Sequence, residues 1–188
     1  MAAVFQPLKA LISVEQYCRM AEAGVFEPDA RIELIDGELF ELAPIGVRHL
    51  QAVNRLNRLL VLAYADLAVV SVQNPVVLRP RSVPQPDLAV LSPQANERGH
   101  PLPETADAWL VVEVADSSLS WDRIVKFRLY ARGGVPVAWL VDVAAERVEV
   151  YERPGAEGFE RRFVVESGGV LELPGLPGRT IEVSAIFG

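Results

Sequence analysis

Residues 108–115 read Ala-Trp-Leu-Val-Val-Glu-Val-Ala, an apolar run interrupted by one ionisable side chain, Glu113. Such a run, bounded by polar segments, is typical of a strand that is buried on both faces of a sheet. A lone carboxylate there is costly to bury, so it needs a cation or a hydrogen-bond donor nearby. The run therefore predicts a central strand and, at Glu113, a candidate functional acid.

Two further residues complete a recognisable set of groups around this strand. Upstream, Asp87 follows Pro86 and opens a second apolar strand, and downstream Lys126 falls on a predicted helix. Two strand-borne acids and a lysine suit a metal-dependent phosphodiesterase, because carboxylates bind Mg²⁺ and the metal activates water and neutralises phosphate.

Simpler explanations of these three residues exist. Glu113 could pair with an arginine, and Asp87 could accept local backbone hydrogen bonds. Lys126 could form an i,i+4 surface pair with Asp122.

The composition is that of an ordinary globular protein of one domain, with 188 residues, 51% hydrophobic and 23% charged. The single cysteine, Cys18, excludes an intramolecular disulfide and a cysteine-based zinc cluster. Residues 1–9 lack the basic start and apolar core of a signal peptide. No apolar stretch reaches the roughly 18 residues of a membrane span. We therefore expect a cytoplasmic protein that does not bind a membrane.

The net charge of −7 argues at first sight against a nucleic-acid partner, because phosphate binding requires a basic surface. The distribution of charge is more informative. Basic residues concentrate in 44–62, in 119–135 and at Arg79 and Arg81, just before the Asp87 strand. This pattern predicts positive charge around the candidate site, although solvated helix faces would explain the same arginines.

The remaining pattern predicts an α/β or α+β chain, a mixed sheet with helices packed on it. Apolar residues at helical spacing predict helices at 13–23, 48–65 and 121–132. Further strands are predicted at 68–72, 75–78, 137–143, 147–151 and 159–165, with a mobile polar loop at 92–107. Trp109, Tyr130 and Trp139 are predicted to lie in the core.

The Asp36-Gly37 pair predicts a hairpin between 31–35 and 38–42. With a two-residue turn, Ile35 faces Glu38 and Glu33 faces Phe40, so both glutamates lie on one face.

His49 lies in the first turn of the predicted helix 48–65, where it begins the buried stripe that Val53, Leu56 and Leu60 continue. Two interpretations of His49 are open: a hydrogen bond to a metal-bound water, or a core histidine with its own partner.

Pro86-Asp87 followed by Glu113 looks like the PD-(D/E)XK nuclease motif. Ala115 stands where that motif has its lysine, and Lys126 matches a variant in which the lysine has moved to the next helix. More closely, the chain resembles the Uma2 (DUF820) family of endonucleases over roughly residues 11–187. The matching segments are Glu33-Leu-Ile-Asp-Gly-Glu38, His49, Pro86-Asp87, 110–114, Asp122-Arg-Ile-Val-Lys126 with Tyr130, 134–136, 139–142, 173–176 and 186–187.

The resemblance implies a restriction-endonuclease-like mixed α/β core with flanking helices and an N-terminal β-hairpin, forming a single domain over 1–188. It implies metal-dependent hydrolysis of DNA phosphodiester bonds, with Asp87 and Glu113 holding Mg²⁺ or Mn²⁺. Lys126 would assist the attacking water. DNA is the expected partner, and a homodimer would suit double-strand cleavage.

Glu38 and His49 would complete this site by the same resemblance, and Glu38 matches the family pattern better than Glu33. The family usually has Leu-Ser-Pro-Ser-Thr where this chain has residues 115–119, and an aromatic residue at Ala138. The altered loop favours a catalytically silent member that binds nucleic acid or a protein as the main alternative. A metal-free hydrolase with paired carboxylates would be resistant to EDTA and would leave the lysine without a role.

Overall fold

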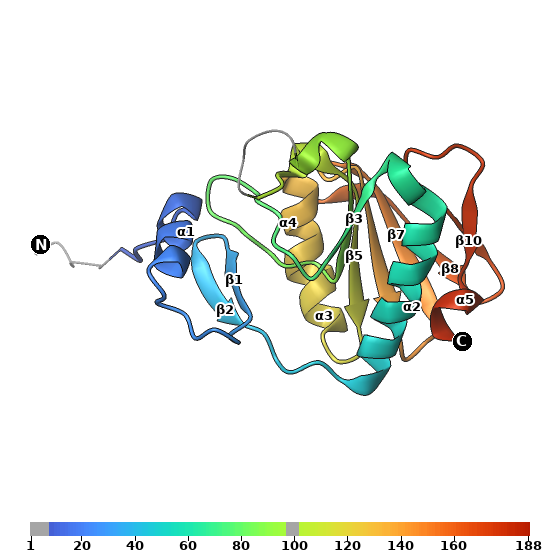
Figure 1. Cartoon of the computed structure of the whole chain (residues 1–188), viewed down its shortest axis with the longest axis horizontal. Helices are drawn as coiled ribbons and strands as arrows, with labels where there is room; N and C mark the ends of the chain where they lie inside the picture. Colours follow the sequence, from blue (N-terminus) through green and yellow to red (C-terminus); the bar gives the residue numbers. More distant parts are fainter. Residues whose placement is uncertain (1–7, 97–101) are drawn as a thin grey trace, which may run out of the picture.

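The computed structural model describes residues 8–96 and 102–188, and a six-stranded sheet forms its centre (Figure 1). The strand order is β3-β4-β5-β6-β7-β8. The strands are β3 (Val69–Val72), β4 (Leu88–Leu91), β5 (Ala108–Ala115), β6 (Val137–Asp142), β7 (Arg147–Pro154) and β8 (Phe159–Glu166). β5 and β6 pair in parallel and the other neighbours pair antiparallel, so the predicted mixed sheet is confirmed.

Helices cover both faces of this sheet (Figure 1). On one face, α2 (Val47–Tyr64) buries Val53, Leu56 and Leu60 in a core that includes alternate residues of β5. On the opposite face, α4 (Phe127–Arg132) buries Phe127 and Tyr130 against the other residues of the same strand. β5 is therefore buried on both faces, as its unbroken apolar sequence predicts.

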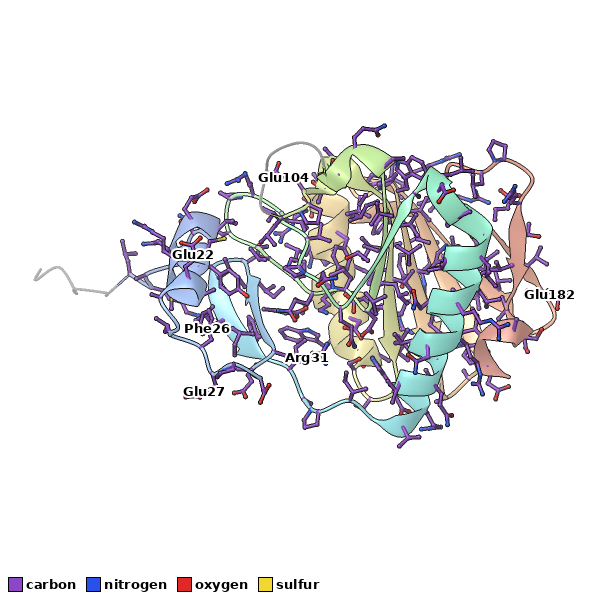
Figure 2. The ribbon with its side chains drawn as sticks, viewed as in Figure 1. Glu22, Phe26, Glu27, Arg31, Glu104 and Glu182 are labelled. Atoms are coloured by element: carbon purple, nitrogen blue, oxygen red, sulfur yellow. The ribbon has the colours of Figure 1, made fainter. Side chains whose placement is uncertain are left out.

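Two small antiparallel hairpins flank the sheet. The N-terminal hairpin, β1 (Ile32–Ile35) and β2 (Glu38–Glu41), follows helix α1 (Val14–Glu22), whose N-cap Ser13 forms a capping box with Gln16. The C-terminal hairpin, β9 (Val170–Glu172) and β10 (Thr180–Glu182), precedes α5 (Ser184–Phe187). The side chain of Glu182 points to solvent from this second hairpin (Figure 2). The short helices are η1 (Ala65–Leu67), η2 (Pro93–Asn96), η3 (Thr105–Asp107) and α3 (Leu119–Trp121).

Three sequence-based predictions differ from the structure. The predicted strand at 75–78 is reduced to isolated bridges at Val77 and Leu78, because the prolines around this segment interrupt any regular ladder. The helix predicted at 121–132 consists of α3, a π-helical turn η4 (Asp122–Lys126) and α4. The segment 92–107 contains η2 and η3, and its residues 97–101, with Pro101, lie outside the described residues.

None of the helices in 8–96 or 102–188 is both long enough and apolar enough to cross a membrane.

The turn of the N-terminal hairpin requires glycine at position 37. Asp36 and Gly37 have φ of 49° and 86°, the positive values of a type I′ turn. A Cβ at Gly37 would lie 2.7 Å from the Cβ of Leu11 and 3.2 Å from the carbonyl of Ile12. We expect Gly37→Ala to lower the free energy of unfolding by about 1–3 kcal/mol, measured by urea denaturation.

Gly168→Ala is the matched control for this prediction. A Cβ at Gly168 would meet no atom within 4 Å, and its φ is not in the left-handed region. Its effect should stay within about 0.5 kcal/mol. Equal losses in the two variants would show that the hairpin turn is not specifically constrained.

Candidate functional site

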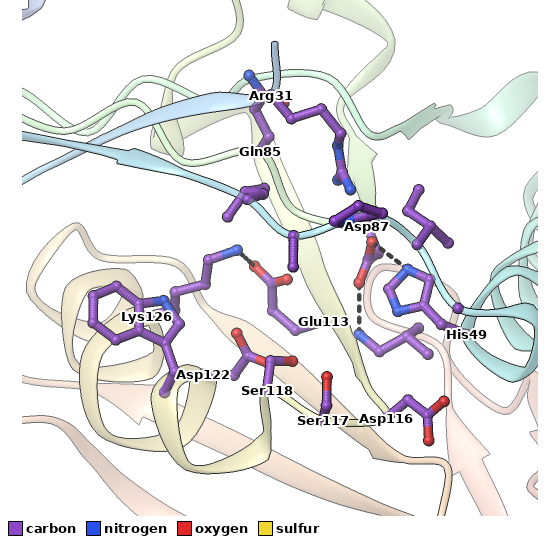
Figure 3. Close-up of a pocket in the computed structure, with 17 residues that line it drawn as sticks. Arg31, His49, Gln85, Asp87, Glu113, Asp116, Ser117, Ser118, Asp122 and Lys126 are labelled. Carbon is purple, nitrogen blue, oxygen red and sulfur yellow. Dashed lines mark hydrogen bonds and ion pairs between the residues drawn. The ribbon is translucent and has the colours of Figure 1, made fainter. Parts of the chain in front are cut away.

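A cavity of about 240 Å³ opens where the start of α2, the end of β5 and η4 meet (Figure 3). Four of the five residues predicted for the site line it, namely Asp87, Glu113, Lys126 and His49. The other polar residues of its lining are Arg31, Gln85, Asp116, Ser117, Ser118 and Asp122. Glu38 is not among the lining residues.

Asp87 directly precedes β4 and is held on both carboxylate oxygens. Its Oδ1 lies 3.0 Å from Nε2 of His49 and 3.3 Å from Nε2 of Gln73. Its Oδ2 accepts a hydrogen bond of 2.9 Å from the backbone N–H of Val114. These contacts hold the Asp87 carboxylate beside the end of β5, against Val114, the residue that follows Glu113.

The same contacts keep Asp87 ionised. Burial alone would raise the pKa of Asp87, but the hydrogen bond and charge of His49 and the Val114 N–H outweigh it. The pKa of Asp87 therefore lies below its usual range. Burial would lower the pKa of His49, yet the hydrogen bond to Asp87 raises it above its usual range. His49 is thus partly buried with Asp87 as its partner, as the core-histidine interpretation predicts, and it also lines the cavity. Its hydrogen bond to a metal-bound water stays a prediction.

Glu113 projects from β5 toward α4 and shares its carboxylate with two donors. Its Oε1 lies 3.0 Å from Nζ of Lys126 and accepts a hydrogen bond from the hydroxyl of Tyr130. Burial raises the pKa of Glu113 well above its usual range. The charge of Lys126 opposes this rise, and nearby carboxylates add to it. The partner of Glu113 is thus a lysine and a tyrosine, not the arginine of the simpler explanation.

Lys126 is buried between two carboxylates. Its Nζ lies 2.9 Å from Oε1 of Glu33 and 3.0 Å from Oε1 of Glu113. Its exposure is only 3%, so the alternative of a surface pair with Asp122 is wrong. Burial alone would lower the pKa of Lys126, but the carboxylates, first among them Glu113, raise it above its usual range. The lysine therefore stays protonated.

Asp122 and Lys126 stand at the two ends of the π-helical turn η4, and both line the cavity. The backbone N–H of Phe127 bonds to the carbonyl of Asp122, five residues earlier, which widens the turn. Asp122 and Lys126 are both buried, and Asp122 accepts a hydrogen bond of 2.5 Å from the hydroxyl of Ser118. Local sequence patterns do not reveal this extra residue in the helix.

The hairpin register is as predicted, with Glu33 opposite Phe40 and Ile35 opposite Glu38. The two glutamates nevertheless have different environments. Glu38 adjoins the turn, is partly exposed and contacts Lys9 at 2.5 Å, away from the cavity. Glu33 is fully buried and contacts Lys126.

The structure therefore brings Glu33 to the cluster, where the family pattern favoured Glu38. A signal for this was present in the sequence, because Glu33 stands between two apolar residues in mid-strand and Glu38 stands at the turn. Sequence reasoning also missed Arg31 and Gln85, and it placed Tyr130 in the core without its bond to Glu113.

The predicted concentration of basic charge around the site is not what the structure shows. Arg79 contacts Glu104 at 3.0 Å and Arg132 contacts Asp36 at 2.7 Å, both outside the cavity lining. Lys126 is the member of the predicted group that lines the cavity, and Arg48 contacts Asp116 of the lining at 2.5 Å. The arginines cluster in the sequence, but in the folded chain most of them pair with acids from distant segments.

A mixed sheet flanked by helices, with two acids and a lysine gathered at one strand end, is the arrangement of the restriction-endonuclease-like α/β class. The family model described as "Uma2: Putative restriction endonuclease" matches residues 14–184. The chain therefore belongs to the Uma2 family.

One solved structure supports the fold. It is a crystal structure described as "a putative nuclease belonging to DUF820" from Anabaena variabilis ATCC 29413. The two chains are 16% identical, with a TM-score of 0.72, over 94% of this chain and 97% of that one. A comparison with curated proteins finds no match.

Proposed function

We propose that this chain is a metal-dependent endonuclease that hydrolyses DNA phosphodiester bonds in the cavity. The observation that carries the proposal is an excess of buried negative charge at the strand ends. Four carboxylates are arranged around one lysine and one partly buried histidine: Glu33, Asp87, Glu113 and Asp122 with Lys126 and His49. Such an excess is stable only with protonation or with a bound cation.

Asp87 and Glu113 are the residues that would hold Mg²⁺ or Mn²⁺. In the described part of the chain, no three His, Cys, Asp or Glu side chains are grouped as a ready metal site. Mg²⁺ needs only one or two protein carboxylates, and takes its other ligands from water and substrate phosphate. The ionised Asp87 and the adjacent Glu113 fit such an ion. Bound there, the metal would supply an activated water and neutralise charge on the phosphate.

The other residues of the cluster would position these groups. Lys126 stays protonated between Glu33 and Glu113, so it is suited to donate hydrogen bonds and unsuited to act as a base. It would orient the attacking water or stabilise the charge that develops on the phosphate. His49 would hold Asp87 in place through its 3.0 Å contact. Glu33 would do the same for Lys126.

Calorimetric titration with Mn²⁺ and Mg²⁺ tests the metal site. We expect a binding heat in the wild type that disappears in Asp87→Ala and persists in Asp66→Ala, because Asp66 is exposed on η1 and does not line the cavity. An unchanged heat in Asp87→Ala would contradict the assignment. A wild type without any heat would be titrated again with a DNA duplex present, since substrate phosphate can complete the coordination.

A catalytically silent member that binds nucleic acid or protein is the second candidate. One observation favours it: the altered loop adds a further acid, Asp116, to the lining of the cavity. This alternative predicts salt-sensitive DNA binding, with no turnover in any divalent metal.

A further inference from the structure

Arg31 occupies a position in the cavity that the proposed mechanism does not use. It directly precedes β1, and its carbonyl accepts a backbone hydrogen bond of 2.9 Å from Leu42. The residue lies where the N-terminal hairpin meets the rest of the molecule (Figure 2). From there its side chain points into the cavity, toward Asp87 (Figure 3).

Arg31 differs from the other cations of the cavity in having no carboxylate partner. Lys126 lies between Glu33 and Glu113, and His49 lies against Asp87. Within residues 8–96 and 102–188, the Arg31 guanidinium contacts no carboxylate within 4.0 Å and makes no hydrogen bond. A half-buried guanidinium left without an acceptor is suited to an anion that enters from outside.

The neighbouring acids give such a cation a role beside that of the metal. A phosphate diester that approaches Asp87 and Glu113 meets carboxylates on the cavity wall, and Asp116 adds another at the rim. Arg48 cannot supply the missing charge, because it is largely exposed and already contacts Asp116 at 2.5 Å. A planar guanidinium can bind two phosphate oxygens at once, which fixes their orientation as well as their charge.

We propose that Arg31 binds the non-bridging oxygens of the DNA phosphate that lies beside Asp87, and so positions the bond to be cleaved. This inference rests on the proposed function, because it names the residue that holds the substrate of that site. The hairpin then contributes twice to the site: Glu33 holds Lys126 from behind the cavity wall, and Arg31, two residues earlier, holds the phosphate.

The test measures binding of a fluorescein-labelled DNA duplex by anisotropy at several salt concentrations, with Ca²⁺ in place of Mg²⁺. For Arg31→Gln we expect the Kd to rise about tenfold, because a charge-assisted contact is lost. The slope of log Kd against log salt should fall by about 1, the signature of one lost phosphate contact. Arg31→Lys should restore the slope but only part of the affinity, because an ammonium cannot bind in the same bidentate way.

Arg58→Gln is the matched control, because Arg58 is exposed on α2 outside the cavity lining. It should change neither the Kd nor the slope. If Arg31→Gln binds DNA like the wild type, or loses affinity with an unchanged slope, the assignment of Arg31 is wrong. A wild type that neither binds nor cleaves DNA would overturn the proposed function as well. Cleavage that survives Arg31→Gln undiminished would overturn the role of Arg31 alone.

Discussion

Glu113→Gln is expected to lower the rate of divalent-dependent DNA cleavage by about 10²- to 10³-fold or more, the scale on which loss of one preorganised electrostatic group acts. Glutamine keeps the shape of the side chain and an oxygen that can accept from Lys126 and Tyr130, but it removes the charge that would bind the metal. The fold should survive, because burial raises the pKa of Glu113 and so favours a neutral side chain at this position, and glutamine is neutral. Asp87→Asn should cause a loss of the same order.

Glu38→Gln is the informative control for this prediction. Family resemblance favours Glu38 as a site residue, but in the structure it contacts Lys9 outside the cavity. Its cleavage rate should therefore stay close to that of the wild type when all variants are assayed on one plasmid DNA substrate. A loss comparable with that of Glu113→Gln would mean that the hairpin rearranges when substrate binds. Full activity in both Glu113→Gln and Asp87→Asn would refute the metal-ligand assignment.

Lys126→Met is expected to lower the free energy of unfolding by about 3–5 kcal/mol, the usual cost of removing one partner of a buried ion pair. The lysine contacts Glu33 and Glu113, and all three residues are buried. Methionine fills a similar volume, so the loss would come from uncompensated charge and not from a cavity. Urea denaturation measures the change, and cleavage activity should disappear in the same variant.

Lys9→Met is the matched control, because Lys9 is the other lysine of the chain and forms an exposed pair with Glu38. Such pairs contribute roughly 0–1 kcal/mol, so this variant should remain nearly as stable as the wild type. Adding Glu33→Gln to Lys126→Met should recover part of the lost stability, because it removes one of the stranded charges. A loss below about 1 kcal/mol in Lys126→Met, with no recovery in the double variant, would show that the ion pairs do not hold the site together.

Much of the fold can be predicted from short-range patterns in the sequence. The Asp36-Gly37 turn specified the hairpin and its register, because that turn type demands positive φ at both positions. The stripe of Val53, Leu56 and Leu60 specified α2 and its buried face. The apolar run 108–115 specified a central strand, and its single acid indicated where the site lies. Each of these features depends on residues a few positions apart.

Which residues meet in the site depends on contacts between segments that are distant in sequence. Glu33, Asp87, Glu113 and Lys126 come from the hairpin, the start of β4, β5 and η4, and only the packed structure sets which acid meets which cation. The choice of Glu33 over Glu38 follows from where the hairpin packs, although both glutamates lie on one hairpin face.

The π-helical turn at 122–126 and the pairing of most arginines with distant acids have the same origin. Local patterns thus determined the elements and marked Asp87, Glu113 and Lys126 as candidates. Tertiary packing alone decided their partners, because charge pairing depends on distances in space and not on spacing in sequence.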